Sequence, residues 1–293
     1  MPSLKDIRRR IDSVKKTQQI TRAMRMVAAA KLRRAEDAIR SARPYAERMR
    51  ETLGEVAKAQ ADVEHPLLQS REEVRNVEVV VITSDRGLAG AFNASVLKDA
   101  EDAMTARESE GGVRISITAL GNKARDYFRR RRPEAIRFAT ALGNRVEYAQ
   151  AAEIAQDLAR RFAEGEVDEV VLVYNEFVSI MTQRPTLATL LPFAPPGGEA
   201  EGDGEEEGLP YEIEPSPEKL LAVLVPKALE IEVFRALLEN QAGEHAARMT
   251  AMENATRNTE ELIERLTLDF NRARQAAITR ELVEIVTGAQ ALD

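Results

Sequence analysis

The chain has 293 residues, of which 44% are apolar, 31% are charged and only 4% are aromatic, and it contains no Cys. This length allows one large or two ordinary domains, and so few aromatic residues are common in long helical packing. Without Cys, the chain can form no disulfide, thiolate metal site or thiol nucleophile. Its two His, His65 and His245, are too far apart in the sequence to suggest a transition-metal site. We therefore expect no metal and no cofactor.

The sequence carries no obvious membrane or export signal. No apolar run approaches the roughly 18 residues of a membrane span, and residues 1–16 lack the apolar core of a secretory signal. These features predict a soluble, cytoplasmic protein.

The net charge of −7 is unevenly distributed along the chain. Residues 1–58 contain 16 Lys and Arg against 7 Asp and Glu, a net charge of +9, which leaves −16 for residues 59–293. Such asymmetry suggests that the basic segment faces an acidic partner or a nucleic acid, although a solvated helix face would have the same composition.

The N-terminal segment repeats apolar side chains at alternating steps of three and four, which is the pattern of a coiled-coil seam. The seam positions are Leu4, Ile7, Ile11, Val14, Gln18, Thr21, Arg25, Ala28, Leu32, Ala35, Ile39, Ala42, Ala46, Met49, Leu53 and Val56. Thirteen of these sixteen are apolar, and the polar exceptions are neighbours, at positions 18, 21 and 25. Ser3 and Asp6 predict a capped helix start. Pro44 predicts a kink, or at least the loss of one backbone hydrogen bond.

The middle of the chain contains β-branched runs that alternate with helical stretches. The predicted strands are Val77–Thr83, Val113–Leu120, Val167–Val178 and Thr186–Leu191, and the predicted helices are Ala91–Arg107, Asn122–Arg132 and Arg145–Glu164. This alternation predicts βαβ units and a mostly parallel sheet. We therefore expect a small, Rossmann-like α/β domain between the helical ends of the chain.

A second helical region follows the Gly- and acid-rich tract Pro195–Gly208, which has too little apolar surface to fold and is expected to be a flexible loop. Ser216 and Pro217 predict the start of a helix, with interruptions at Pro226 and Gly243. A seam reappears at Leu238, Ala242, His245, Met249, Met252, Thr256, Thr259, Ile263, Leu266, Phe270, Ala273 and Ala277, and then slips by one residue to Ile278, Leu282 and Ile285.

Together these segments predict an α/β domain inserted between the two helices of a long antiparallel coiled coil. The predicted divisions are an N-terminal coiled-coil helix (1–58), a linker (59–76), the α/β domain (77–195), an acidic flexible loop (196–214) and a C-terminal coiled-coil helix (215–293). At about 1.5 Å per residue the helices would be roughly 80 and 105 Å long, so part of the second must lack the first as its partner. Such a chain is expected to sit inside or against a larger assembly.

The stretch ITSDRGLAGAFN, residues 82–93, is placed like a nucleotide-binding loop between a strand and a helix. It lacks the Lys and Ser/Thr of a Walker A loop and the glycine pair of a dinucleotide fingerprint. We interpret it as structural, with Gly87 making the turn and Gly90 allowing the helix to pack closely on the sheet.

Two other polar segments are weaker candidates for a binding surface. Tyr127–Phe138 places four Arg beside aromatic residues, which suggests either a nucleic-acid patch or a solvated helix end. The C-terminal NRARQAAITRELVEIVTGAQAL is either an exposed helix face or a contact surface. No Ser/His/Asp or Cys/His arrangement can be assembled, so we predict a protein that is not an enzyme.

Three segments together resemble the gamma subunit of bacterial F-type ATP synthases. They are residues 7–35 (IRRRIDSVKKTQQITRAMRMVAAAKLRRA), the loop 82–93, and residues 248–289, which begin RMTAMENATRNTEELIERL. SARPYAERM and the NEF…TQRPT…LLP run fit as well, and the resemblance covers essentially the whole chain in order.

The resemblance implies a central rotor shaft that couples proton translocation to ATP synthesis or hydrolysis. It implies one copy per complex, contacts with the alpha and beta subunits, the epsilon subunit and the c-ring, and no binding of nucleotide or nucleic acid by the chain itself. It also implies a peripheral position on the cytoplasmic side of the bacterial inner membrane.

The same resemblance assigns contact residues. Positions that meet the beta catch loop in the family correspond to Arg274, Gln275, Thr279 and Glu281. Met24 matches a coupling position beside the beta lever loop, with Arg25 as its neighbour. Tyr211 and Glu214 fall on the side of the c-ring and the epsilon subunit.

Two alternative functions remain open on the residues alone. One is a coiled-coil scaffold that binds a nucleic acid or another partner through its basic helix. The other is a Rossmann-like nucleotide-binding enzyme with helical arms.

Overall fold

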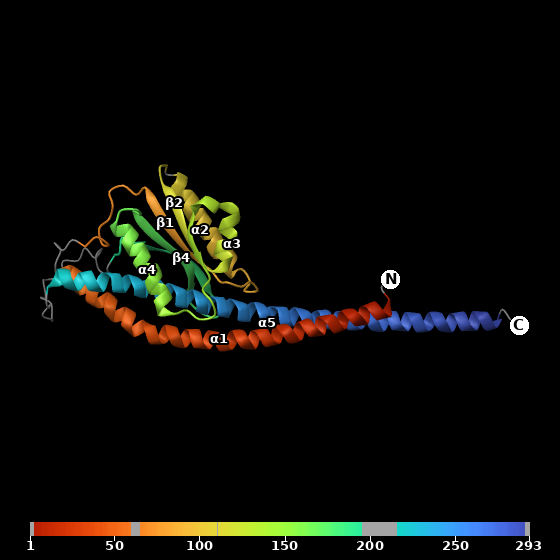
Figure 1. Ribbon diagram of the computed structural model, residues 1–293. Helices are drawn as coiled ribbons and strands as arrows, with labels where there is room; N and C mark the ends of the chain where they lie inside the picture. Colours follow the sequence, from red (N-terminus) through yellow and green to blue (C-terminus); the bar gives the residue numbers. More distant parts are fainter. Residues whose placement is uncertain (1–2, 60–64, 110, 195–215, 291–293) are drawn as a thin grey trace, which may run out of the picture. The chain divides into compact units, whose positions relative to one another are not determined.

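The computed structural model describes residues 3–59, 65–109, 111–194 and 216–290. Its elements, in chain order, are α1 (Leu4–Ala59), β1 (Asn76–Ile82), α2 (Phe92–Ser109), β2 (Arg114–Leu120), α3 (Asn122–Arg131), a 3₁₀ turn (Pro133–Ala135), β3 (Ile136–Thr140), α4 (Tyr148–Ala163), β4 (Glu169–Phe177), β5 (Gln183–Leu191) and α5 (Pro217–Gln290) (Figure 1). The predicted fold class, two long terminal helices that pack together and an α/β sheet between them in sequence, is confirmed. The finer division into five segments stays a prediction, and its acidic loop lies outside the described residues.

The chain divides into two compact units, to which both long helices contribute. The first, here called the helical unit, consists of Met1–Ala29 and Arg248–Asp293. The second, here called the sheet unit, consists of Ala30–Ala247.

The sheet unit is built on five strands in the order β3-β2-β1-β4-β5. The first four are mutually parallel, and β5 pairs antiparallel with β4. Strand β3 was not predicted, because its sequence IRFAT follows the arginine run and contains only five residues. The segment Tyr127–Phe138 is therefore the end of α3, a turn and the start of an edge strand.

Alternate residues of β1 face two apolar cores on opposite sides of the sheet. Val79 and Val81 pack with Val96 and Phe128 from α2 and α3. On the other face, Val80 and Ile82 belong to a cluster that α4 completes together with the parts of α1 and α5 in this unit. Because both faces of the sheet are covered, the sequence of β1 is a nearly continuous apolar run.

The predicted seams match the burial of the two long helices along most of their length. All sixteen N-terminal seam positions are buried or half-buried, and so are the twelve from Leu238 to Ala277. The predicted slip of the seam to Ile278, Leu282 and Ile285 is wrong, because these three side chains are exposed rather than packed against the chain.

The helix starts follow the predicted capping chemistry. The Ser3 hydroxyl accepts a hydrogen bond from the Asp6 amide at 3.2 Å, and the Asp6 carboxylate accepts one from the Ser3 amide at 3.3 Å. The Ser216 hydroxyl accepts one from the amide of Lys219 at 3.4 Å. These bonds satisfy amides that have no partner inside the helix.

Helix α5 continues through Pro226 and Gly243, so the predicted interruptions are wrong. Gly243 is needed for a close contact, since a Cβ there would lie 2.9 Å from Cε2 of Phe92. Across the described ranges, no helix has an apolar stretch of the length that crossing a bilayer requires.

Candidate functional site

The loop between β1 and α2 is held rigid by its own side chains. The Ser84 hydroxyl donates to the carbonyl of Arg86 at 2.6 Å, and the Ser84 amide donates to Oδ1 of Asn93 at 2.9 Å. Nδ2 of Asn93 donates back to the Ser84 hydroxyl at 2.9 Å. This clamp joins the end of β1 to the first turn of α2.

The glycines of this loop have roles different from those inferred from sequence. Gly90 has φ +58°, and a Cβ there would meet no atom within 4 Å, so it serves the backbone conformation and not close packing. Gly87 does not have a positive φ, whereas the neighbouring Leu88 has φ +64°. Close approach is instead required at Gly121, where φ is +98° and a Cβ would lie 2.5 Å from the Thr83 carbonyl oxygen.

The carboxylate of Asp85 occupies the position where a nucleotide-binding fold would expose amides to phosphate. One oxygen accepts from the amides of Asn122 at 2.9 Å and Leu142 at 3.3 Å, and the other accepts from the amide of Gly143 at 2.7 Å. Asn122 is the first residue of α3, and a helix N-terminus at the carboxyl end of a parallel strand is an anion site. Here the protein supplies the anion itself.

Helix α5 packs on the same edge of the sheet. Nδ2 of Asn240 donates to the carbonyl of Thr83 at 3.3 Å, and Gly243 lies against Phe92. Nδ2 of Asn175, at the end of β4, donates to the carbonyl of Phe92 at 2.9 Å. The corner formed by residues 82–93 therefore attaches α5 to the sheet, which agrees with the structural interpretation of the loop.

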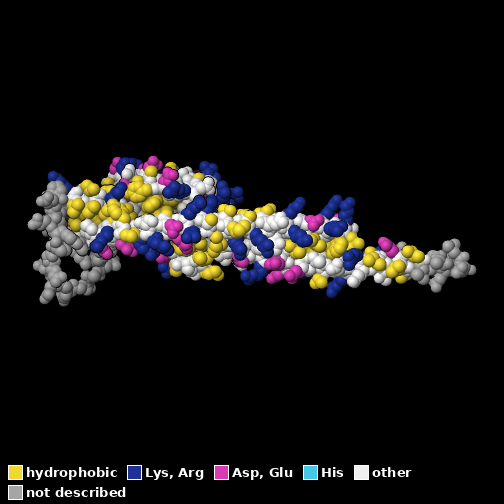
Figure 2. All heavy atoms as spheres, turned by 90° about the horizontal axis from the view of Figure 1, so that it is seen from below, with side chains coloured by type: hydrophobic (Ala, Val, Ile, Leu, Met, Phe, Trp, Pro, Cys, Tyr) yellow, Lys and Arg dark blue, Asp and Glu magenta, His cyan; other side chains and the backbone are white. Residues whose placement is uncertain are grey.

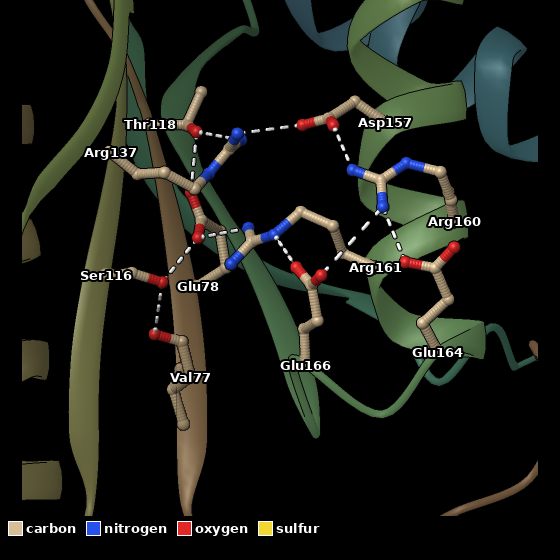
Figure 3. Close-up of polar contacts among 10 residues, drawn as sticks. All are labelled: Val77, Glu78, Ser116, Thr118, Arg137, Asp157, Arg160, Arg161, Glu164 and Glu166. Atoms are coloured by element: carbon tan, nitrogen blue, oxygen red, sulfur yellow. Dashed lines mark hydrogen bonds and ion pairs between the residues drawn. The ribbon is translucent and has the colours of Figure 1, made fainter.

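A buried carboxylate on β1 is the centre of a charged cluster in the sheet unit (Figure 3). Glu78 is fully buried and accepts hydrogen bonds from Ser116, from Thr118 at 2.6 Å and from Arg161 at 2.8 Å. Burial alone would raise the pKa of Glu78, but these hydrogen bonds and the charge of Arg137 lower it overall.

The two arginines of this cluster are themselves paired. Arg137 on β3 lies 3.2 Å from Glu78 and 2.9 Å from Asp157, and Arg161 on α4 lies 2.9 Å from Glu166. The cluster ties α4 to the sheet, and its charges are satisfied by one another. The only sequence signal for it was an isolated Glu in the apolar run NVEVVVI.

Two of the three polar seam positions of α1, Thr21 and Arg25, meet polar side chains of α5 in the helical unit. The Thr256 hydroxyl of α5 donates to the Thr21 hydroxyl at 2.8 Å, and both threonines are buried. Arg25 forms an ion pair with Glu253, with the two side chains 42% and 44% exposed. This hydrogen bond lowers the pKa of Glu253. The polar seam residues Thr21 and Arg25 are thus matched by polar residues of α5.

The predicted contact residues near the C-terminus are all exposed on α5. They are Arg274, Gln275, Thr279 and Glu281, and none makes a hydrogen bond or ion pair with another described residue. Met24 is half-buried, and Arg25 is engaged with Glu253. Tyr211 and Glu214 lie outside the described residues.

Sequence reasoning treated several apolar residues near this end of α5 as seam positions, but they face solvent. The predicted seam residues Ile278, Leu282 and Ile285 are about half exposed or more, with Ile285 at 67%, and Val283, which was not a predicted seam position, is exposed as well. Figure 2 shows apolar side chains gathered beside the C-terminal residues. Helical spacing places Arg274, Ile278, Glu281 and Ile285 along one face, so charged and apolar groups alternate there.

Comparisons with known proteins cover nearly the whole chain. A family described as ATP synthase matches residues 3–292. The ATP synthase gamma chain of Pelotomaculum thermopropionicum is 48% identical over 293 residues, and that of Desulforamulus reducens is 50% identical over 293 residues, each covering 100% of both chains.

Solved structures agree in fold. A chain in the central stalk and c-ring of Tetrahymena thermophila mitochondrial ATP synthase has a TM-score of 0.61 and 25% identity, covering 80% of this chain and 99% of that one. A chain in the rotor of Euglena gracilis mitochondrial ATP synthase has a TM-score of 0.64 and 22% identity, covering 94% of this chain and 98% of that one.

Proposed function

This chain belongs to the family of ATP synthase gamma chains, and we propose that it couples proton translocation through a membrane ring to the conformational cycle of the catalytic beta subunits. It is the central rotor stalk and a non-catalytic subunit. The cycle runs toward ATP synthesis, and in reverse it accompanies hydrolysis.

The observation that carries this proposal is the unpartnered apolar surface at the C-terminal end of α5. Beyond Ala277, large apolar side chains of a continuous helix face solvent within the helical unit. An isolated helix of this kind is only marginally stable in water, and an exposed apolar surface marks an interaction site. A bearing formed by the surrounding alpha and beta subunits would cover it.

The polar residues on the same stretch suit a contact that must be broken and remade. Arg274, Gln275, Thr279 and Glu281 are exposed and have no partner among the described residues, so they are free to meet the beta catch loop. Exposed charge pairs contribute only about 0–1 kcal/mol each, so they can be exchanged at each rotational step.

The coupling role of Met24 and Arg25 follows a related argument. Arg25 is already paired with Glu253 and is still 42% exposed. Its guanidinium has five N–H donors, so it can hold Glu253 and still donate to an acidic side chain of the beta lever loop. Met24 beside it supplies an adaptable apolar contact.

The remaining partners belong to the same proposal. The Tetrahymena structure is described as central stalk and c-ring, and a second Euglena structure as including F1 and the c-ring, which supports contacts with both. We place one copy of this chain per complex, with Tyr211 and Glu214 toward the c-ring and the epsilon subunit. The complex lies on the cytoplasmic face of the bacterial inner membrane, and this chain binds neither nucleotide nor nucleic acid.

Co-expression with the alpha and beta subunits tests the function. We expect a stable complex whose ATPase turnover depends on this chain, and no heat of ATP binding by the isolated chain in calorimetry. Deletion of Ala273–Asp293 should reduce ATP-driven proton pumping in the complete enzyme and leave the circular dichroism of the sheet unit unchanged. Unchanged pumping by the truncated enzyme would contradict the assigned contact residues.

A further inference from the structure

We propose that a cavity between α1 and α5 in the sheet unit is a binding site for a small organic cation, an ammonium group on a body about the size of a benzene ring. The cavity has a volume of about 210 Å³, and all the residues that line it belong to the sheet unit. None of them lies beyond Ala277, so the inference does not depend on the proposed function.

Much of the cavity wall is apolar. Ile231 and Leu238 of α5 are buried there, and Ala42 and Ala46 of α1 line the same cavity. The seam of α1 has alanine at both of these successive positions, and a methyl group fills less of the space between two helices than the larger side chains of other seam positions. An apolar cavity of about 150 Å³ is large enough to bind benzene, so this one can hold a ring with a short substituent.

The carboxylate of Glu239 is the polar group of the cavity that requires a partner. It lines the cavity, and its side chain is only 12% exposed. Oε1 accepts a hydrogen bond from Arg235 at 2.8 Å, whereas Oε2 is buried and has no hydrogen-bond partner among the described residues. The last side-chain torsion of a glutamate has broad preferences, so a small rotation can turn this oxygen toward a donor in the cavity. A charge-assisted hydrogen bond from a ligand would remove the cost of the unpaired oxygen.

Arg235 does not neutralise this carboxylate completely. Its guanidinium donates to Glu239 and also to Glu232 at 2.9 Å, so one positive charge faces two negative charges. Burial raises the pKa of Glu239, and the charge of Arg235 offsets this only in part. A second cation beside Glu239 would favour the charged form of its carboxyl group.

The other charged groups at the cavity balance one another. Glu176 is paired with Arg184 at 2.5 Å, and α1 contributes one residue of each sign, Arg43 and Glu47. The two carboxylates that share Arg235 therefore leave a net charge of −1. This charge matches a monocation, and the apolar wall matches its body.

Nuclear magnetic resonance of the full-length chain, with labelled alanine methyl groups and benzylammonium as the probe, tests the site. We expect saturable shifts of the Ala42 and Ala46 methyl signals, with a dissociation constant in about the millimolar range because so small a ligand makes few contacts. The uncharged probe benzyl alcohol should bind about tenfold more weakly. The anionic probe phenylacetate should cause no shifts.

Two variants separate the contribution of charge from that of volume. Glu239→Gln keeps the shape of the side chain, so benzylammonium should bind about tenfold more weakly while benzyl alcohol binds as it does to wild type. Unchanged binding of benzyl alcohol also shows that the cavity is still formed. Ala42→Leu fills the cavity, so neither probe should bind, and the thermal midpoint should be unchanged or higher.

Glu232→Gln is the matched control, because it removes the same charge from the same arginine at a residue that does not line the cavity. Binding of benzylammonium should weaken less than about threefold. An equal loss in the Glu232 and Glu239 variants would show that Glu239 makes no direct contact and would overturn the inference. Absence of shifts at Ala42 and Ala46, or stronger binding of phenylacetate than of benzylammonium, would overturn it as well.

Discussion

The two units of this chain differ in whether their ion pairs and apolar helix faces are buried or exposed. In the sheet unit, the most buried charge, Glu78, is held by four hydrogen-bonding side chains, and both faces of the sheet are covered. In the helical unit, the interhelical ion pair Arg25–Glu253 is nearly half exposed, and large apolar side chains of α5 face solvent. The buried carboxylate of Glu78 is paired within the sheet unit, whereas the helical unit has a half-exposed ion pair and large apolar side chains of α5 in solvent.

This difference suggests that the sheet unit provides stability and the helical unit provides coupling. A buried charge that loses its partner is expensive, so the Glu78 cluster supports a single arrangement of strands and α4. Exposed pairs are weak, which suits a surface that must change partners. The two units should therefore respond very differently to mutation, and five predictions test this.

The largest effect is expected from Glu78→Gln, which leaves Arg137 and Arg161 without their shared buried carboxylate. The free energy of unfolding should fall by about 3 kcal/mol, as measured in urea. The control Glu176→Gln disrupts the exposed pair with Arg184 and should cost less than about 1 kcal/mol. Similar losses of unfolding free energy for both variants would contradict the expected difference between buried and exposed pairs.

The same cluster predicts a pH dependence. The pKa of Glu78 is lowered in the folded state, so its contribution is present above the unfolded pKa and is lost as pH falls through the folded pKa. The stability of wild type should therefore decline below about pH 4, and Glu78→Gln should show a shallower decline. Parallel curves for the two proteins would contradict the assignment.

An equal effect at one site and a smaller one at the other are expected from adding a methyl group at two glycines with positive φ. Gly121→Ala should cost about 3 kcal/mol, because the Cβ also collides with the Thr83 carbonyl. Gly90→Ala should cost about 1 kcal/mol, because only the backbone conformation opposes it. Urea unfolding measures both, and the reverse order would show that the contacts at the two sites are misassigned.

In the helical unit, Thr256→Val should cost about 1 kcal/mol, because it removes the hydroxyl that donates to the buried Thr21 hydroxyl. The double variant with Thr21→Val should be closer to wild type, since two apolar groups then replace the hydroxyl pair. Amide exchange in residues 248–270 reports this locally. A double variant less stable than the single variant would contradict the interaction.

The smallest effect is expected at the Arg25–Glu253 pair. A double-mutant cycle with Arg25→Ala and Glu253→Ala should give a coupling of about 0–1 kcal/mol that decreases with added salt. A coupling of several kcal/mol, insensitive to salt, would show that this pair behaves like the buried cluster of the sheet unit.

Local sequence patterns predicted the seams as far as Ala277, both helix caps and four of the five strands, because each depends on residues close together in the chain. The fifth strand, β3, was missed because a five-residue edge strand has too few positions to reveal a period. The roles of Gly90 and Gly121 were missed for another reason. A glycine is required by the φ or by the neighbouring atom at that position, and neither can be read from composition.

The long helices, their apolar faces and the family of the chain could be predicted from the amino-acid sequence, since periodicity and motifs are properties of the chain alone. Which groups meet became visible only in the folded molecule. It placed Asp85 on the amides of Asn122, Leu142 and Gly143 and Glu78 among Ser116, Thr118 and the two arginines, and it left the apolar side chains beyond Ala277 of α5 exposed. These pairings join residues that lie tens of positions apart, so they exist only after the chain has folded back on itself.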